Sequence, residues 1–180
     1  MSQTKKRPGI IALLGYTVES FEAAARLGYD FVAVVPPGYD DLLEKDGIRA
    51  VPWDFTTIND RSTELAETLI GIGVRLAVPL YEETVEWAGA LNARFFKNPR
   101  LFNRYWALRD KAMMKRRAQM SGIRVGVFEE VESHEDVLRF FKRINEAEGR
   151  IEGDLPLGVH IKPTTAAGSV GHRYLKSVEA

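Results

Sequence analysis

Residues 158–171 read GVHIKPTTAAGSVG and are followed by an apolar-basic segment, 172–176. The short apolar run predicts a strand that ends at Lys162, because Pro163 cannot donate to a strand ladder, and the small residues after it predict a turn into a second strand. Glycines allow backbone N–H groups to approach an anion closely, Ser169 adds a hydroxyl donor, and Lys162 supplies positive charge. Two structures fit this pattern: a phosphate-binding loop beside a lysine, or an ordinary hairpin with a polar turn.

The composition of the chain narrows the classes of function. The 180 residues include 25 Lys+Arg and 25 Asp+Glu, so the formal net charge is zero and nothing attracts the whole protein to nucleic acid or to an anionic membrane. The absence of cysteine excludes disulfide scaffolds, thiolate nucleophiles and cysteine-type zinc sites. The apolar run after Gly9 is short and predicts a strand instead of a signal peptide, and no stretch has the length of a membrane span. We therefore expect a soluble, cytoplasmic protein.

Apolar runs in the first eighty residues alternate with helical patterns. The runs span residues 10–14, 31–35, 48–51 and 74–79. Strands that are apolar on both faces and alternate with helices imply a parallel sheet covered on both sides, with sites at the carboxyl ends of its strands. The first helix is expected to turn Phe21, Ala24, Ala25 and Gly28 inward and to end at Gly28. The sequence thus predicts an α/β fold that begins with a Rossmann-like domain.

The first domain lacks the usual nucleotide fingerprints. Its first strand is followed by a single glycine, Gly15, instead of Gly-x-Gly-x-x-Gly, and residues 34–37 read Val-Val-Pro-Pro where an acidic ribose ligand is expected. No Gly-x-x-x-x-Gly-Lys is present. These departures argue against dinucleotide binding by this domain.

Tyr81, Glu82 and Glu83 follow the fourth predicted strand. Acidic residues in a first helical turn are favourable to the helix dipole, so capping is one interpretation of the two glutamates. The carboxyl end of a parallel strand is also where substrate groups gather, so any of the three side chains could meet a substrate amine. Both interpretations stay open.

Residues 95–106 mix arginine and lysine with aromatic side chains. Aromatic and basic residues in alternation can bind single-stranded nucleic acid by stacking and charge neutralisation. Because the net charge is balanced and the pattern is not repeated, we favour a packed connector between domains and expect no nucleic-acid partner.

The remaining part of the chain predicts two helices and an intervening strand. Asp110 can cap a helix that ends at Gly122, and Lys111 in its first turn opposes the helix dipole unless an anion is bound there. Residues 125–131 predict a strand, and Ser133 can cap an amphipathic helix with an apolar face. The histidines, His134, His160 and His172, show no metal-ligand spacing. Without a cysteine nucleophile or a serine elbow, acyl-enzyme hydrolysis is not supported.

Four motifs in order resemble the ATP-grasp superfamily, and its carboxylate–amine ligase branch in particular. They are Arg-Asp-Lys at 109–111, Ser-Gly-Ile at 121–123, Val-x-Ile-Lys-Pro at 159–163 and Ala-Gly-Ser-Val-Gly at 167–171. The resemblance implies a Rossmann-like pre-ATP-grasp domain over residues 1–107. It also implies that residues 108–180 form the first, small α+β part of a truncated ATP-grasp fold.

The resemblance also implies a set of ATP-binding residues. The family has phosphate-binding lysines at the positions of Lys111 and Lys162, and a loop at the positions of Gly168, Ser169 and Gly171 that folds over the phosphates. The family's reaction activates a small carboxylate as an acylphosphate, which an amine or another nucleophile attacks. The implied ligands are therefore ATP with Mg²⁺ and a small carboxylate.

The family's adenine-binding hinge, magnesium ligands and phosphate-steadying arginine lie further along than Ala180. No catalytic residue or metal ligand is therefore assigned here, and we expect the N-terminal portion of a longer ligase that is inactive alone. Several alternatives remain open: a truncated, non-catalytic binding or regulatory module, a Rossmann-type small-molecule binder, or another ATP-grasp branch such as a biotin-dependent or purine-pathway carboxylase. A homodimer is not excluded.

Overall fold

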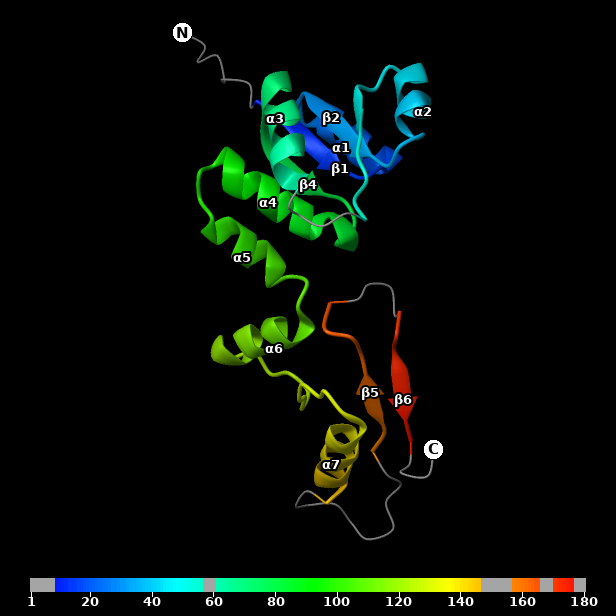
Figure 1. Ribbon diagram of the computed structural model, residues 1–180, viewed down its shortest axis with the longest axis vertical. Helices are drawn as coiled ribbons and strands as arrows, with labels where there is room; N and C mark the ends of the chain where they lie inside the picture. The colour runs from blue at the N-terminus through cyan, green and yellow to red at the C-terminus, as the bar shows by residue number, and fades with distance from the viewer. Residues whose placement is uncertain (1–8, 57–60, 147–156, 166–169, 177–180) are drawn as a thin grey trace. The chain divides into compact units, whose positions relative to one another are not determined.

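The computed structural model describes residues 9–56, 61–146, 157–165 and 170–176 (Figure 1). The chain divides into two compact units, Met1–Arg109 and Asp110–Ala180. The domain boundary predicted from the sequence lies between Ala107 and Leu108.

A four-stranded parallel sheet forms the centre of the first unit. The strand order is β3-β2-β1-β4, and every described neighbouring pair is parallel. The strands are β1 (Ile10–Leu14), β2 (Phe31–Val35), β3 (Ala50–Pro52) and β4 (Val74–Pro79). The helices are α1 (Val18–Arg26), α2 (Asp40–Lys45), α3 (Ser62–Ile72), α4 (Val85–Phe95) and α5 (Arg100–Trp106), with a 3₁₀ turn, η2 (Glu82–Thr84), before α4. The predicted α/β class is confirmed, and β3 lies slightly later than expected.

Both faces of the sheet are covered by helices, because the strands are apolar on both sides (Figure 1). Ala12 and Leu14 of β1 face α3 and α4, where they pack with Leu65 and Leu91. Alternate residues of the same strands pack against α1 and α2 on the other face. Full burial of a leucine contributes about 1.5–3 kcal/mol, so these two apolar layers stabilise the unit.

Two positions predicted to face the core from the first helix are wrong. Phe21 and Ala24 are buried, whereas Ala25 and Gly28 are exposed. Residues three apart share a helix face, but the next residue is rotated by about 100° and here reaches solvent.

Helix α5 packs on α4 within the first unit. An added Cβ at Gly89 would lie 2.6 Å from Tyr105 Cβ, so glycine permits this close approach. The buried Asn92 side chain accepts from the Ala77 N–H and donates to the Ala77 carbonyl, both at 2.8 Å, and donates to the Tyr105 hydroxyl at 3.0 Å. The aromatic-basic segment is thus anchored through β4 and α4.

The second unit contains a hairpin packed on a helix. Strand β5 (Val159–Ile161) pairs antiparallel with β6 (Arg173–Leu175), and α7 (His134–Asn145) places Phe140 and Phe141 against Val159. Helix α6 (Lys111–Met120) precedes them and is capped by Asp110, which accepts from the Met113 N–H at 2.9 Å. The predicted caps at Asp110 and Ser133 are confirmed, as is the pairing of two strands on either side of the glycine-rich loop.

The predicted strand over residues 125–131 is wrong, because this segment pairs with no described strand. Its side chains contact helices instead. Glu130 pairs with Arg116 of α6, and the Lys115 ammonium lies 4.9 Å from the centre of the Phe128 ring. Val127, in the middle of the segment, is 75% exposed. An apolar pattern without a partner strand does not make a ladder.

Ser133 caps α7 through a reciprocal pair of contacts. The Asp136 N–H donates to Ser133 Oγ at 3.1 Å, and the Ser133 N–H donates to the Asp136 carboxylate at 3.0 Å. Hydrogen bonds from Ser133 and from the Glu132 N–H, assisted by Arg139, lower the pKa of Asp136 below its ordinary 3.8.

Candidate functional site

The carboxyl edge of the parallel sheet holds one group of predicted site residues. Strand β1 lies between β2 and β4. The chain adds β2 and β3 on one side of β1 and then returns to add β4 on the other side, which makes β1 the topological switch point of the sheet. Such a reversal opens a crevice outside the carboxyl ends of the two adjacent strands. The residues that follow β1 and β4 therefore occupy the position where ligands bind in this architecture.

Tyr81 lies directly against the end of β1. An added Cβ at Gly15 (φ +119°) would lie 2.6 Å from Tyr81 Cε2, so both the backbone conformation and the neighbouring ring require glycine there. The Tyr81 hydroxyl donates to the Tyr16 carbonyl oxygen. The Thr84 hydroxyl donates to the Leu14 carbonyl at 3.1 Å and joins η2 to β1.

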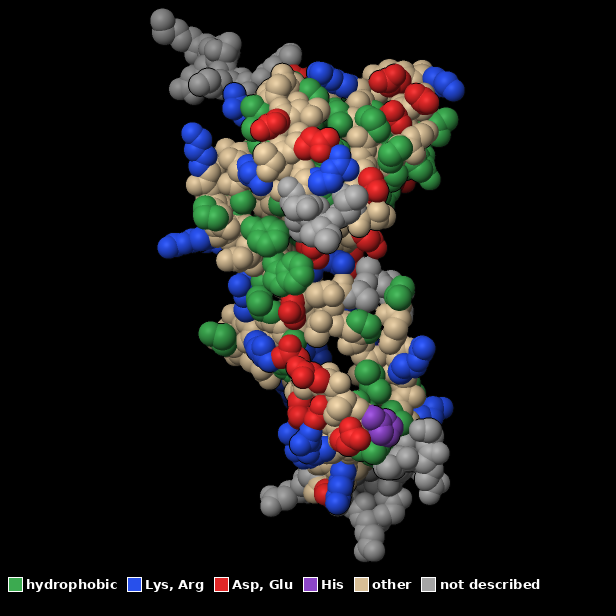
Figure 2. Space-filling model, viewed as in Figure 1, with side chains coloured by type: hydrophobic (Ala, Val, Ile, Leu, Met, Phe, Trp, Pro, Cys, Tyr) green, Lys and Arg blue, Asp and Glu red, His purple; other side chains and the backbone are tan. Residues whose placement is uncertain are grey.

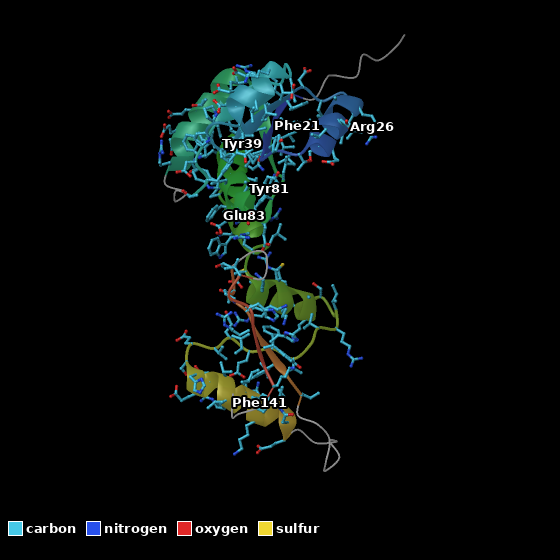
Figure 3. All side chains as sticks on the ribbon, turned by 90° about the vertical axis from the view of Figure 1, so that its right-hand side faces the viewer. Phe21, Arg26, Tyr39, Tyr81, Glu83 and Phe141 are labelled. Carbon is cyan, nitrogen blue, oxygen red and sulfur yellow. The ribbon has the colours of Figure 1, made fainter. Side chains whose placement is uncertain are left out.

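A second tyrosine pair extends this edge. The Tyr16 and Tyr39 ring centroids are 5.4 Å apart, and both side chains are exposed. Tyr39 follows β2, Tyr16 follows β1 and Tyr81 follows β4, so three strand ends each contribute a tyrosine. Figure 3 labels Tyr39, Tyr81 and Glu83. From the sequence only Tyr81 can be predicted at this edge, because the positions of Tyr16 and Tyr39 depend on strand order.

Glu82 and Glu83 have different surroundings. The Arg109 guanidinium lies 3.0 Å from the Glu82 carboxylate and 3.7 Å from that of Glu86. The Arg109 side chain is 10% exposed, whereas that of Glu82 is 44% exposed. Glu83 is exposed and makes no ion pair with a described basic residue. Glu82 thus stabilises the buried arginine, and Glu83 is the more available carboxylate.

Lys111 and the segment after β5 lie side by side in the second unit. Lys111 is the first residue of α6, and its main-chain N–H donates to the Thr164 carbonyl at 3.0 Å. Lys162 follows β5 directly and is exposed. The hydrogen bond therefore joins the start of α6, which carries Lys111, to Thr164, which lies two residues after Lys162.

Gly171 closes the same end of the hairpin. Its φ is +71°, and an added Cβ would lie 2.7 Å from Pro163 Cγ, so a side chain is excluded on both grounds. Lys111, Lys162 and Gly171 are thus contributed by backbone segments that meet around residues 162–164. Gly168 and Ser169, the other two predicted loop residues, lie outside the described residues.

No group of three or more His, Cys, Asp or Glu side chains within the described residues could hold a metal ion. Within the same part of the chain, no helix is both long enough and apolar enough to cross a membrane.

Comparison with known proteins gives a match in structure alone. No family model and no curated protein sequence matches the chain. A crystal structure of the L-amino acid ligase from Bacillus licheniformis matches with a TM-score of 0.65 at 17% sequence identity. The match covers 97% of this chain and 41% of the ligase chain, so the protein spans about two fifths of that ligase's length. This likeness shows that the chain shares the fold of the corresponding part of that ligase.

Proposed function

We propose that the chain is the ATP-binding part of an ATP-dependent carboxylate–amine ligase that acts through an acylphosphate. Residues 1–107 would be its pre-ATP-grasp domain, and residues 108–180 the beginning of its ATP-grasp fold. The hydrogen bond from Lys111 to Thr164 carries this proposal, because it joins the two lysine-bearing segments at the glycine end of the hairpin. The structural likeness to an L-amino acid ligase adds support from the whole chain.

The chemistry of the described residues supports a polyphosphate ligand. Lys111 and Lys162 supply two cations, and Gly171 lies so close to Pro163 that it can carry no side chain. In phosphoryl transfer a protein acts mainly by positioning the reactants and stabilising charge, so these groups would hold and orient the nucleotide. Bound ATP would supply the phosphoryl group that activates the carboxylate.

The proposed reaction also requires Mg²⁺, but no metal ligand is assigned among these residues. No group of three or more His, Cys, Asp or Glu side chains among the described residues could hold a metal ion, and Mg²⁺ in nucleotide sites is commonly held by one or two carboxylates together with phosphate oxygens and water. The expected ligands belong to the portion of the ligase that follows this chain in the family.

The carboxyl edge of the sheet is proposed as the substrate side. Glu83 is the best candidate for a substrate amine because Glu82 is already paired with Arg109. Tyr81 would line the substrate site without binding the amine, since its hydroxyl donates to the Tyr16 carbonyl and its ring packs on Gly15. The substrate would be a small carboxylate of amino-acid type.

Direct titration of the 180-residue chain with ATP tests the proposal. We expect saturable binding of ATP, with inorganic triphosphate as a competitor, because the proposed contacts are to phosphates. We expect no ADP release with amino acids, since the chain alone would bind without turnover. Absence of ATP binding would favour a small-molecule binder of Rossmann type, and binding by a protein that ends naturally here would favour a regulatory module.

A cytoplasmic location is part of the proposal and rests on the absence of cysteine.

A further inference from the structure

The hairpin brings together two histidines that are distant in sequence. The register pairs His160 with Tyr174, which places His172 diagonally across from His160 on the same face. Nδ1 of His160 and Nε2 of His172 are 2.8 Å apart. The ring planes differ by 19°, and the ring centroids are 5.0 Å apart. At this separation, near-parallel imidazoles meet edge to edge, with one nitrogen of each directed at the other.

This histidine pair lies on the face of the hairpin that α7 leaves uncovered. Val159 and Leu175 pack against Phe140 and Phe141 of α7. Because side chains alternate along a strand, His160 belongs to the opposite face, where the Tyr174 ring stacks on it at a centroid distance of 4.6 Å. Figure 2 shows histidine side chains at the surface of the second unit. Solvent therefore reaches the pair, while Tyr174 restrains one of its rings.

We propose that His160 and His172 together bind one divalent ion of Cu²⁺ or Ni²⁺ type, in place of the proton they share. Two metal–nitrogen bonds of about 2.0–2.1 Å at a right angle place the nitrogens about 2.9 Å apart. The observed 2.8 Å matches that spacing. Because each nitrogen now points at the other, both rings must turn by about 45° about their Cβ–Cγ bonds to direct their lone pairs at a shared ion, and this torsion is broad for histidine.

The spacing favours particular metals. A tetrahedral zinc ion would require the nitrogens to separate to about 3.3 Å, whereas the square-planar or tetragonal geometry of Cu²⁺ and Ni²⁺ accepts the present spacing. Water must complete the coordination, because the described residues place no third His, Cys, Asp or Glu ligand at the pair. The site is therefore expected to be weaker than a three-ligand protein site.

Positive neighbours weaken the site further and give it a recognisable salt dependence. Lys162 follows His160 on the same strand face, Arg173 lies in β6, and the Lys176 ammonium is 5.8 Å from the centre of the Tyr174 ring. These charges repel a metal ion, and salt screens such repulsion between exposed groups. Metal affinity should therefore rise with ionic strength, whereas the proposed ATP affinity should fall.

Calorimetric titration of the full chain with Ni²⁺ tests the inference. His134, which begins α7, offers a matched control because its replacement removes an imidazole outside the pair. We expect the wild-type chain and His134→Asn to bind one equivalent with equal affinity. His160→Asn and His172→Asn should each lower the affinity at least about tenfold, because loss even of an outer-shell partner of a metal ligand typically costs about 10–100-fold. Far-ultraviolet circular dichroism confirms that each variant is folded.

Proton NMR identifies the ligands directly. Paramagnetic Ni²⁺ should broaden the imidazole C–H resonances of His160 and His172 and leave those of His134 sharp. Absence of binding, broadening of all three histidines alike, or unchanged affinity in folded His160→Asn and His172→Asn would overturn the inference. ATP binding is measured without Ni²⁺, so the two proposals succeed or fail separately.

Discussion

The main-chain N–H of Lys111 donates to the carbonyl oxygen of Thr164 at 3.0 Å, although helices α6 and α7 separate the two residues in the chain. This contact fixes the start of α6 beside the loop end of the β5–β6 hairpin. It also satisfies one of the first-turn N–H groups of α6, whereas the Lys111 cation opposes the helix dipole there at a small local cost. An anion bound between Lys111 and Lys162 would offset that local cost.

Replacement of Gly171 by alanine should destabilise the second unit. The new Cβ would meet Pro163 Cγ at 2.7 Å, and the backbone has a φ of +71°. We expect a loss of about 2–3 kcal/mol from strain and overpacking together. Gly122→Ala is the control, since it has a φ of +75° with no heavy atom within 4 Å of the added Cβ. Its cost should be about 1–2 kcal/mol.

Amide hydrogen exchange in the second unit measures both glycine variants. The tryptophans, Trp53, Trp87 and Trp106, all belong to the first unit and do not report on the hairpin directly. Equal loss of protection in the two variants would show that the contact with Pro163 has no energetic weight.

Arg109→Met should destabilise the first unit by about 1–3 kcal/mol. Loss of one partner from a buried ion pair costs about 3–5 kcal/mol, but Glu82 is 44% exposed and water can solvate its freed carboxylate. The control is Arg61→Met, which removes an exposed pair with Glu64 and should cost under about 1 kcal/mol. Urea denaturation followed by circular dichroism compares them, and equal midpoints would contradict a buried structural role for Arg109.

Asn92→Ala should be more damaging than an exposed asparagine replacement. It removes three hydrogen bonds and leaves the buried N–H and C=O of Ala77 without their side-chain partner. We expect a loss of about 2–4 kcal/mol. Asn103→Ala on the exposed side of α5 should change stability by about 0.5 kcal/mol or less. Tryptophan fluorescence during urea denaturation provides the measurement, and similar values for both variants would exclude the proposed anchoring.

The cap of α7 should make the second unit sensitive to acid. The pKa of Asp136 is lower in the folded protein than its ordinary 3.8, so the folded state favours the ionised carboxylate. The stabilisation is complete above the unfolded pKa and is lost as the pH falls through the lower folded value. Asp136→Asn should remove this part of the pH dependence. Amide exchange of α7 at a series of pH values tests it, and parallel profiles for wild type and variant would contradict it.

Local pattern predicts the first unit well because its strands are buried on both faces. Val32 and Val34 pack toward α3 and α4, while Ala33 and Val35 pack toward α1 and α2, so the whole run is apolar. The apolar pattern of residues 125–131 wrongly predicts a strand. Phe128 contacts Lys115 of α6, and Val127 is exposed to solvent. Strand formation depends on a partner that a local pattern does not reveal.

The candidate sites required knowledge of register and strand order. The sequence identifies Arg109 only as part of the Arg-Asp-Lys motif. Its ion pair cannot be predicted, because its partner Glu82 follows β4, far away in the chain. His160 and His172 showed no metal-ligand spacing, yet hairpin pairing places their nitrogens 2.8 Å apart. A prediction of the hairpin register, with His160 opposite Tyr174, would have brought them together.

ATP binding by Lys162→Ala tests the central claim most directly. Lys142→Ala on α7 is the matched control, since it removes the same charge from an exposed residue whose partner is Glu146. Calorimetry should show affinity for ATP reduced by about 1–3 kcal/mol in Lys162→Ala and in Lys111→Ala, the range for a charge-assisted contact, and unchanged in Lys142→Ala. Unchanged ATP affinity in both Lys162→Ala and Lys111→Ala would contradict the assignment of this hairpin to the nucleotide.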